Sequence, residues 1–317
     1  MEKIYLIVNP AAAGGRSYEE YNLVKPFINS LNNVKTFFSE HPMHSIELAR
    51  NAVLDGVERI ISFGGDGTHN EVVNGVFQGL KKLYPSNLEE TIKNKDSRIP
   101  AVAFVSIGSG NDLRKTLNLP KNIKEALDIA LSADARWIDV GHFEFKDFDG
   151  KDASRYFVNI LSGGFSGTVT MKANQGKKTA FKNIIYLNAL IKTLIFATIP
   201  RGLLINGGKK IDGQFFEFDI SNGKFFGGGM LLSPLSKIDD GVFNISVFRN
   251  YTGLEVLFKI YKLYNGTITR EKKLYYEQAK EAYVECTPKA LIEADGEVVG
   301  FTPMKVEILE RSLKAVF

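Results

Sequence analysis

The chain has 317 residues, of which 44% are hydrophobic and 24% charged, so we expect a water-soluble protein with two domains. Its net charge of +4 is too small to predict a nucleic-acid partner, although it is compatible with an anionic substrate or membrane surface. The single cysteine, Cys286, excludes an internal disulfide and a Cys-rich metal site, and it fits a reducing cytoplasm.

The first part of the chain alternates between strand-like and helix-like segments. In order, these are a strand at Lys3 to Val8, a helix at Tyr18 to Leu31, a strand at Val34 to Phe38, a helix at Ser45 to Leu54, a strand at Glu58 to Ser62, a helix ending near Leu83, a strand at Pro100 to Val105 and a helix at Ile123 to Leu131. This alternation predicts a Rossmann-like parallel-sheet domain over residues 1–133, with a nucleotide at the C-terminal ends of the strands. The polar stretch from Pro85 to Arg98 is predicted to be a surface insertion.

The sequence changes character near Asp134, after which short β-like runs are separated by turn residues. The runs are Trp137 to Phe143, Arg155 to Leu161, Phe215 to Ile220, Gly241 to Phe248, Ala282 to Cys286 and Met304 to Ile308. They predict an antiparallel β-sandwich domain over residues 134–317, with helices only at Phe181 to Ile199 and Leu254 to Leu263. The most apolar run, Ile184 to Ile199, carries Asn188 and Lys192, so we expect a core helix rather than a membrane span.

The turn Phe63-Gly64-Gly65-Asp66-Gly67-Thr68 joins a predicted strand to a predicted helix. Thr68 and Glu71 have the spacing of a capping box, which predicts that the helix begins just after the glycines. Free backbone N–H groups of this helix and the absence of Cβ atoms at the glycines are typical of a phosphate site. A carboxylate there, Asp66, would repel phosphate unless a cation, such as Mg²⁺ on a nucleotide, lay between them. The alternative is a tight turn in which Asp66 serves only local turn chemistry.

Two further glycine-containing turns follow predicted strands. They are Asn9-Pro10-Ala11-Ala12-Ala13-Gly14-Gly15 and Ile107-Gly108-Ser109-Gly110-Asn111-Asp112. Loops from three parallel strands are expected to meet at one edge of the sheet. None of the three turns is a Walker loop or completes G-x-G-x-x-G, so ordinary ATPase and dehydrogenase functions lose their support.

The three turns together resemble those of the diacylglycerol kinase catalytic domain, in the bacterial lipid kinase branch. The resemblance extends through Asn70-Glu71-Val72-Val73-Asn74-Gly75 and continues in order through Phe157-Val158-Asn159, Gly227-Gly228-Gly229-Met230, Asp239-Asp240-Gly241 and Asp295-Gly296-Glu297. It covers nearly the whole chain, and several spaced motifs in order are more specific than any one of them. It implies transfer of a phosphoryl group from ATP to a lipid hydroxyl, in a cleft between the two domains.

The resemblance also implies roles for individual residues. ATP contacts are expected at Asn9, Pro10, Gly14, Ser39, Gly64, Gly65, Asp66, Gly67, Thr68, His69, Asn70, Ser109 and Asn111. Glu297 is expected to accept the proton of the attacking hydroxyl. Asp66 and Asp112 are further catalytic candidates, because phosphoryl transfer needs charge neutralisation and Asp66 or Asp112 could hold Mg²⁺ for it. Asp240 matches a structural Mg²⁺ site that also uses backbone oxygens of Lys237 and Val242. Ser39 and Ser109 stand where threonine is commoner in the family, but each keeps the hydroxyl.

Simpler interpretations of these residues remain open. Asp112 is also placed to cap a helix beginning at Leu113, and Asp295-Gly296 favours a plain hairpin turn. Asp239-Asp240-Gly241 is also typical of a solvated turn. The four histidines, His41, His44, His69 and His142, have no metal-ligand spacing and are expected at the surface or in loops.

The function implied by the resemblance is an ATP- and Mg²⁺-dependent lipid kinase of the cytoplasm that visits the membrane surface, with diacylglycerol as the expected acceptor. Alternatives are a sphingosine-type or other lipid kinase, more distantly an NAD kinase, or a nucleotide-binding regulator without catalysis. One basic and tyrosine-rich cluster consists of Lys259, Lys262, Arg270, Lys272 and Lys273. It is either a solvated face or a contact for anionic lipid head groups. The sequence leaves the oligomeric state open.

Overall fold

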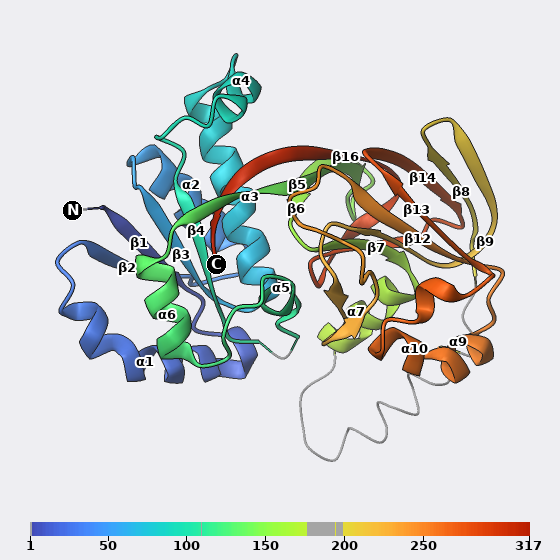
Figure 1. The fold of residues 1–317 in the computed structure, drawn as a ribbon, viewed down its shortest axis with the longest axis horizontal. Coiled ribbons are helices and arrows are strands. Elements are labelled where there is room, and N and C mark those ends of the chain that lie inside the picture. The colour runs from blue at the N-terminus through green and yellow to red at the C-terminus, as the bar shows by residue number, and fades with distance from the viewer. Residues whose placement is uncertain (1, 109, 176–193, 195–198) are drawn as a thin grey trace.

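The computed structural model of the chain describes residues 2–108, 110–175, 194 and 199–317. Its first domain, drawn in blue to green in Figure 1, contains a parallel sheet and helices that cover it. The elements are β1 (Ile4–Val8), η1 (Ala12–Gly15), α1 (Arg16–Asn29), β2 (Val34–Phe38), α2 (His44–Leu54), β3 (Arg59–Gly64), α3 (Asp66–Leu83), α4 (Leu88–Lys93), β4 (Ala101–Ser106), α5 (Asp112–Thr116) and α6 (Ile123–Ser132).

The strands of this domain pair in the order β2-β1-β3-β4, all parallel, which confirms the predicted fold class. Alternate residues of each strand face opposite sides of the sheet. In β1, for example, Tyr5 and Ile7 pack against α2 and α3, whereas Ile4, Leu6 and Val8 pack against α1 and α6. Because helices cover both faces of the sheet, β1, β3 and β4 are buried throughout and their sequences are mostly hydrophobic. The edge strand β2 is only partly buried and contains Lys35 and Thr36.

The second domain is built mainly from antiparallel strands. Its elements are β5 (Ala135–Lys146), β6 (Asp152–Phe157), β7 (Ile160–Gly164), α7 (Phe165–Gln175), β8 (Arg201–Asn206), β9 (Lys209–Ser221), β10 (Phe225–Phe226), β11 (Met230–Leu231), β12 (Phe243–Arg249), α9 (Gly253–Lys259), α10 (Tyr261–Tyr264), η2 (Ile268–Arg270), β13 (Leu274–Ala279), β14 (Glu281–Thr287), β15 (Leu291–Ala294) and β16 (Glu297–Val316).

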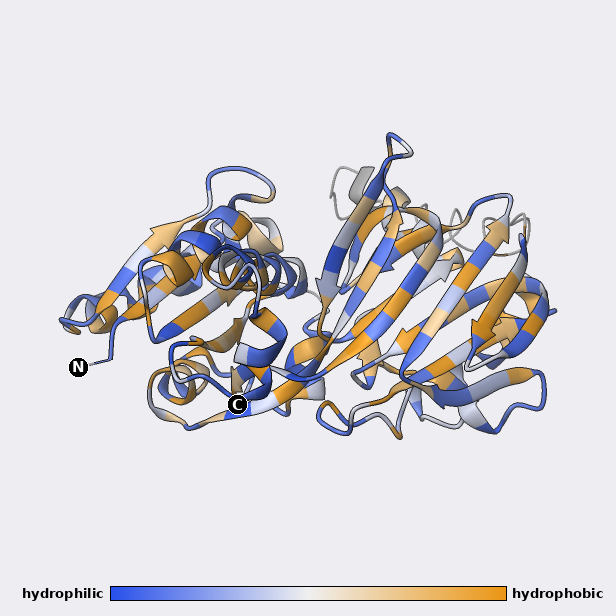
Figure 2. Ribbon diagram, turned by 90° about the horizontal axis from the view of Figure 1, so that it is seen from above, coloured by the Kyte–Doolittle hydropathy of each residue, from blue (hydrophilic) through white to orange (hydrophobic). Residues whose placement is uncertain are grey.

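The strands of the second domain fold over a common core, as predicted for a β-sandwich. The path β16-β15-β7-β9-β8-β14 returns to β16, so the long strands β9 and β16 contribute to both layers. Figure 2 shows hydrophobic and hydrophilic residues alternating along many of these strands. In β14, Ala282, Val284 and Cys286 point into the core, and the residues between them are more exposed. This period of two is the signature of a strand with one buried face.

The strands β5 and β16 run together between the two domains, and β16 is the dark red ribbon that spans them in Figure 1. At the end of β16, Ala315 and Val316 pair in parallel with Val102 and Ala103 of β4. The chain therefore returns to the first sheet after building the second domain. Both domains contribute residues to the cleft described below.

Some elements differ from the sequence prediction. The run from Arg155 to Leu161 is two strands, because the backbone N–H groups of Val158, Asn159 and Ile160 all turn toward the carboxylate of Asp295 instead of continuing a ladder. The predicted insertion at residues 85–98 contains the short helix α4. Apart from Leu194 and Ile199, the predicted helix at residues 181–199 lies outside the described residues. None of the helices in the described ranges has both the length and the apolar character needed to cross a bilayer.

Candidate active site

We number the three glycine turns in chain order: the first follows β1, the second follows β3 and the third follows β4. The second turn joins β3 directly to α3, but the helix does not begin where the capping box predicts. Helix α3 starts at Asp66, inside the turn, with Gly65 as its N-cap and no side-chain cap. The predicted capping box is wrong because both of its side chains have other partners. Thr68 Oγ1 accepts a hydrogen bond from Asn9 Nδ2 (2.9 Å), and the Glu71 carboxylate accepts those of Met43 N and Ser45 N at the start of α2. Uncapped N–H groups at the start of α3 remain available to an anion.

The three turns meet at the C-terminal edge of the parallel sheet. Asn9 N donates to Phe63 O (3.0 Å) and Ile107 N donates to Gly64 O (2.6 Å), so the first and third turns are both hydrogen-bonded to the second. Between these turns and the second domain lies an open cleft of about 690 Å³. Of the predicted ATP and catalytic residues, those that line it are Asn9, Gly65, Asp66, Gly67, Thr68, Asp112 and Glu297.

Asp66 and Asp112 lie together in the cleft, at the start of α3 and α5. Asp66 accepts hydrogen bonds from the backbone N–H groups of Asp112 and Leu113, both at 3.2 Å, so it is Asp66 that caps α5. Asp112 does not cap its own helix, because its carboxylate accepts from Gly228 N (2.8 Å) and Lys115 Nζ (3.1 Å). Burial, and then repulsion by Asp112, raise the pKa of Asp66 to about 6. Two carboxylates held this close favour a cation between them.

The sequence Asp295-Gly296-Glu297 forms the tip of the β15–β16 hairpin. Asp295 and Gly296 have positive φ angles of 48° and 90°, as a two-residue hairpin turn requires. The Asp295 carboxylate accepts hydrogen bonds from Val158 N, Asn159 N, Ile160 N and Asn70 Nδ2, at distances of 2.9 to 3.0 Å. Asp295 therefore anchors the hairpin, and the hairpin presents Glu297 to the cleft.

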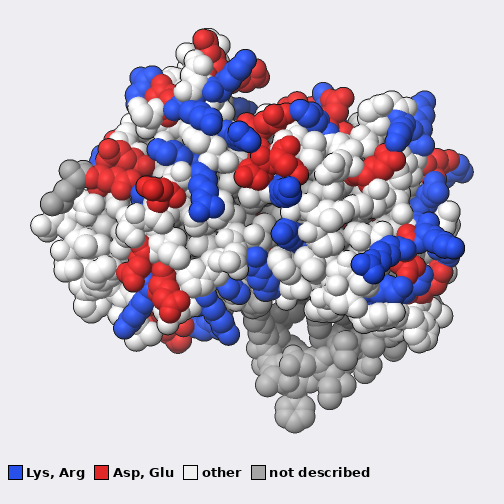
Figure 3. Space-filling view, viewed as in Figure 1, with Lys and Arg blue, Asp and Glu red and all other residues white. Residues whose placement is uncertain are grey.

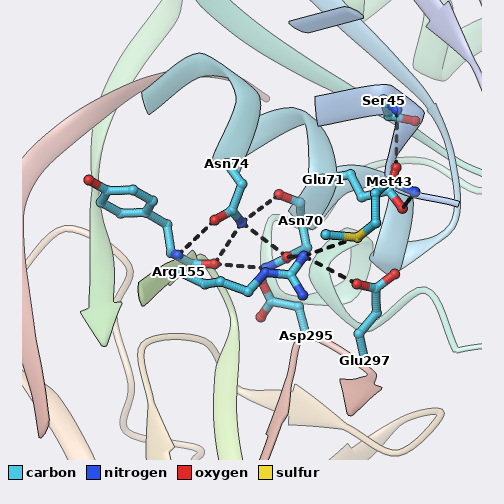
Figure 4. Close-up of polar contacts among 9 residues, drawn as sticks. Met43, Ser45, Asn70, Glu71, Asn74, Arg155, Asp295 and Glu297 are labelled. Carbon is cyan, nitrogen blue, oxygen red and sulfur yellow. Dashed lines mark hydrogen bonds and ion pairs between the residues drawn. The ribbon is translucent and has the colours of Figure 1, made fainter. Parts of the chain in front are cut away.

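Glu297 faces the glycine turn across the cleft. A Cβ atom added to Gly67 would lie 2.6 Å from Glu297 Oε1, so the carboxylate reaches the turn only because residue 67 is glycine. Burial raises the pKa of Glu297 to about 7, while the nearby Arg155 guanidinium opposes this shift and Glu71 adds to it. Arg155 Nη2 lies 3.5 Å from Glu297 Oε2 and 3.4 Å from Asn70 Oδ1 (Figure 4). Near neutral pH, Glu297 is thus poised to exchange a proton.

Asn70 and Asn74 join the two domains beside Glu297. The side-chain amides of both residues donate to Tyr156 O (2.9 Å), and Tyr156 N donates back to Asn74 Oδ1 (Figure 4). Asn70 thus holds the second domain in place beside α3, although it was predicted to contact ATP. Arg155 was missed by the sequence analysis; its only signal is its position two residues before Phe157-Val158-Asn159.

His69 was predicted to lie at the surface or in a loop, and this prediction is wrong. The residue lies on α3, beneath the second glycine turn. Its imidazole is 1% exposed and lies between Ser62 Oγ (2.7 Å) and Ser106 Oγ (2.9 Å). Burial lowers its pKa to about 3, so the ring is neutral. Its backbone N–H donates to Gly65 O, and the residue does not line the cleft. It supports the turn from within the first domain.

The other predicted ATP residues lie around the cleft. A second cavity of about 540 Å³ contains Pro10 and Ser39 together with Tyr18, Tyr21 and Phe38. Gly14 has a positive φ of 71° in the first turn. A Cβ at Gly64 would lie 2.6 Å from Thr68 Oγ1, and Asn111 Nδ2 donates to Gly108 O (2.9 Å), so these two residues shape the second and third turns. Ser109 lies outside the described residues.

Several cleft residues were given no role in the sequence analysis. Glu293 lies two residues before Asp295 on β15 and accepts a hydrogen bond from Thr170 Oγ1 of α7 (2.8 Å). Gly227 and Gly228, between β10 and β11, close the cleft next to Asp112. The glycine run was recognised only as part of the resemblance, and Thr170 has no local signal at all.

The predicted structural metal residues Lys237, Asp240 and Val242 lie in the second domain, outside the cleft. Asp240 Oδ1 accepts a hydrogen bond from Val242 N (3.4 Å), and burial raises its pKa while Lys237 opposes this shift. Nearby, Asp139 accepts from Gly241 N (2.7 Å) and Arg311 N (2.6 Å). No three His, Cys, Asp or Glu side chains in the described part of the chain gather as a metal cluster.

The basic cluster lies on α9, α10, η2 and the turn before β13, and acidic residues partly neutralise it. Lys259 and Lys262 both pair with Glu271, and Lys273 pairs with Glu255. For Arg270 and Lys272, no acidic partner lies within 4 Å among the described residues.

A protein-family model matches each half of the chain. Residues 3–143 match the diacylglycerol kinase catalytic domain, and residues 159–317 match the YegS C-terminal, NAD kinase β-sandwich-like domain. The "Probable lipid kinase YegS-like" of Chromohalobacter salexigens is 32% identical over 66% of this chain and 60% of its own length. The diacylglycerol kinase of Bacillus subtilis is 24% identical over 100% of this chain and 96% of that protein.

Solved structures share the fold. A diacylglycerol kinase from Bacillus anthracis strain Sterne aligns over 100% of this chain and 97% of that chain, with a TM-score of 0.69 and 21% identity. A yeast NADH kinase aligns over 99% of this chain and 82% of that chain, with a TM-score of 0.50 and 9% identity.

Proposed function

Because the chain belongs to the lipid kinases with a diacylglycerol kinase catalytic domain, we propose that it transfers the γ-phosphate of ATP to the free hydroxyl of diacylglycerol. The products are ADP and phosphatidic acid. The observation that carries this proposal is the position of Glu297, whose carboxylate faces the start of α3 across the cleft. This position supports a proton acceptor, Glu297, facing the proposed binding site for the phosphates of ATP.

The triphosphate is proposed to lie along the first and second glycine turns. Gly65 leaves room for phosphate oxygens beside the uncapped N–H groups of α3, where the helix dipole also favours negative charge. The 540 Å³ cavity that contains Pro10 and Ser39 then takes the nucleoside. Its aromatic wall includes Tyr21 and Phe38, whose rings meet edge to face at 5.2 Å.

Mg²⁺ is proposed to be held by Asp66 and Asp112. A Cβ placed on Gly110 would lie 3.1 Å from Asp66 Oδ2 and 3.4 Å from Asp112 Oδ2, so the two carboxylates converge on one region of the cleft. One or two carboxylates together with phosphate oxygens and water are the usual ligands of Mg²⁺ in kinases. When bound, the ion neutralises charge on the phosphate oxygens during transfer.

Glu297 is proposed to act as the general base. Its carboxylate accepts the proton of the lipid hydroxyl as the hydroxyl oxygen bonds to the γ-phosphorus, and the bond from that phosphorus to the bridging oxygen of ADP breaks. Asn70 and Asp295 fix the hairpin that carries Glu297, and Arg155 holds its carboxylate toward the cleft. Phosphoryl transfer depends mainly on such positioning.

The experiment that tests this function measures transfer from radiolabelled ATP to a panel of acceptors: diacylglycerol, monoacylglycerol, sphingosine, phosphatidylglycerol and NAD. Diacylglycerol is expected to be the preferred acceptor, with activity that depends on Mg²⁺ and on Glu297. Preferential labelling of sphingosine or NAD would overturn the choice of acceptor, and no labelling of any acceptor would overturn the catalytic assignment. Because the substrate is a membrane lipid, the enzyme is proposed to act in the cytoplasm at the membrane surface.

A further inference from the structure

A ridge of apolar side chains stands exposed on the second domain. It consists of Leu254 and Phe258 of α9 and Tyr261 of α10, which are 49%, 76% and 57% exposed. Ile260, the one residue between the two helices, has helical dihedral angles, so α9 leads directly into α10. The spacing of four and then three residues places the three side chains on one side of the helix. We call these three residues the apolar ridge.

Other side chains of the same helices pack on the core. Leu263 is buried, and Val256 and Leu257 are partly buried, in a cluster with Phe248 and Tyr251. These residues attach α9 and α10 to the domain, so the three residues of the apolar ridge are not needed for that packing. A single exposed apolar residue is ordinary, but adjacent large ones on one helix side are typical of a binding surface.

Charge around the apolar ridge indicates what binds there. Residues 253–273 contain five basic and two acidic residues, a net charge of +3. Lys259 and Lys262 lie on the flank of the same helices and are tied to Glu271, while Arg270 and Lys272 lie close by in sequence and are exposed. In Figure 3, blue and red side chains are intermixed on the lower right of the molecule. A helix with an apolar side and a basic flank suits the interface of an anionic bilayer.

The apolar ridge lies on the same edge of the second domain as α7, which contributes to the cleft. Helix α10 is followed by Gly266, where an added Cβ would lie 2.8 Å from Leu231 Cδ2 of β11. The loop between β10 and β11 contains Gly227 and Gly228, which line the cleft. Figure 1 shows α7, α9 and α10 along the same lower edge of the second domain, and Thr170 of α7 also lines the cleft.

We propose that the apolar ridge enters the surface of an anionic bilayer and so holds the cleft at the lipid from which its substrate comes. This inference rests on the proposed lipid kinase function. The insertion is driven by burial of Leu254, Phe258 and Tyr261 among acyl chains, and the basic residues select an anionic surface. Lys259 and Lys262 are paired with Glu271, so they contribute less to binding than the apolar ridge does.

The test measures binding to vesicles of phosphatidylcholine with and without phosphatidylglycerol, by co-sedimentation, without ATP or diacylglycerol. Phe258→Ser is expected to weaken binding to the anionic vesicles about tenfold, because a large buried apolar side chain contributes at least that factor. Phe148→Ser is the matched control, since Phe148 is 55% exposed in the turn between β5 and β6. Lys272→Glu should weaken binding in low salt and have less effect in high salt.

Depth of insertion is measured separately with tryptophan. The chain has one tryptophan, Trp137, so Phe258→Trp and Phe148→Trp are made in a Trp137→Phe background. Lipids brominated on their acyl chains should quench the tryptophan at 258 and leave the one at 148 unchanged. Melting temperatures show whether each variant is folded.

Equal binding of folded Phe258→Ser and Phe148→Ser would overturn the proposal, as would absence of quenching at position 258. A change from dimer to monomer in Phe258→Ser, with vesicle binding unchanged, would assign the apolar ridge to a second copy of the chain instead. Vesicle binding requires no catalysis. Insertion without phosphorylation of any lipid would therefore overturn the proposed function and leave the docking surface standing.

Discussion

The carboxylate of Glu297 lies against Gly67, with Oε1 only 2.6 Å from the position that a Cβ atom of residue 67 would occupy. Glu297 begins β16 of the second domain, and Gly67 belongs to the first turn of α3. The contact sets the width of the cleft at the point where the phosphate and the acceptor hydroxyl are proposed to meet. A side chain at position 67 would displace the Glu297 carboxylate from the start of α3.

Gly65→Val is expected to abolish ATP binding while the protein still folds. At Gly65 the φ angle is −92°, and an added Cβ would meet protein atoms only at 3.8 Å, so the substitution fits the fold. The side chain would instead occupy the cleft beside the N–H groups of α3. Isothermal titration calorimetry with ATP and a melting curve measure the two effects. An unchanged ATP affinity in the folded variant would show that phosphate does not bind at this turn.

Glu297→Gln is expected to lower kcat by about 10² to 10⁴, the usual contribution of a general base. ATP affinity and melting temperature should be retained, because Glu297 belongs to the acceptor side of the cleft. Asp66→Asn is the comparison variant, and it should instead weaken the binding of Mg²⁺ and of the nucleotide. Single-turnover phosphorylation of diacylglycerol separates the two. If Glu297→Gln transfers phosphate within a few-fold of the parent, the hairpin is only structural and the base must be sought at Asp112.

The pH dependence of kcat should follow the Glu297 carboxyl. Its pKa is raised to about 7 by burial, and only the deprotonated form accepts a proton. The value of kcat should therefore rise with pH up to about 7 and then level off, with a loss of about tenfold per pH unit below that point. Glu297→Gln should remove this limb of the profile. A midpoint near pH 4.5 in the parent enzyme would show that the carboxyl acts from a solvated environment.

Asp240→Ala is expected to lower thermal stability and to remove part of the effect of Mg²⁺ on stability. The proposed ion would join the Asp240 carboxylate to the backbone near Lys237 and Val242, so its loss would loosen the start of β12. Thermal unfolding with and without Mg²⁺ measures both. A variant with the stability and Mg²⁺ response of the parent would exclude this site.

The sequence predicts the parallel sheet well because buried parallel strands are continuous hydrophobic runs separated by helix-forming segments. It also predicts the turns that approach the cleft, since glycine and Asp-Gly have strong local preferences. The sequence could not predict the partners of side chains within those motifs. Thr68 and Glu71 have capping-box spacing, but each is used by a distant segment, Asn9 and the start of α2 respectively.

Long-range contacts explain the other differences. His69 follows the glycine turn and has no local signal of burial, yet it lies between Ser62 and Ser106 of two neighbouring strands. Arg155 of β6 is 142 positions from Glu297 of β16 along the chain, and its approach to that carboxylate depends on how the strands of the second domain pair. Local motifs indicate the turns that approach the cleft, but they do not show which distant residues the sheets bring beside those turns.

The pairing of β16 with β4 affects the order in which the protein can fold during synthesis. Until Ala315 and Val316 leave the ribosome, one edge of β4 lacks its final partner, and exposed strand edges promote aggregation. A fragment of residues 1–133 should therefore scatter more light after refolding than the whole chain, whereas a clear monomeric fragment would contradict this. During translation, the parallel sheet of the first domain stays incomplete until β16 is made, and a chaperone that covers the edge of β4 would protect the nascent protein.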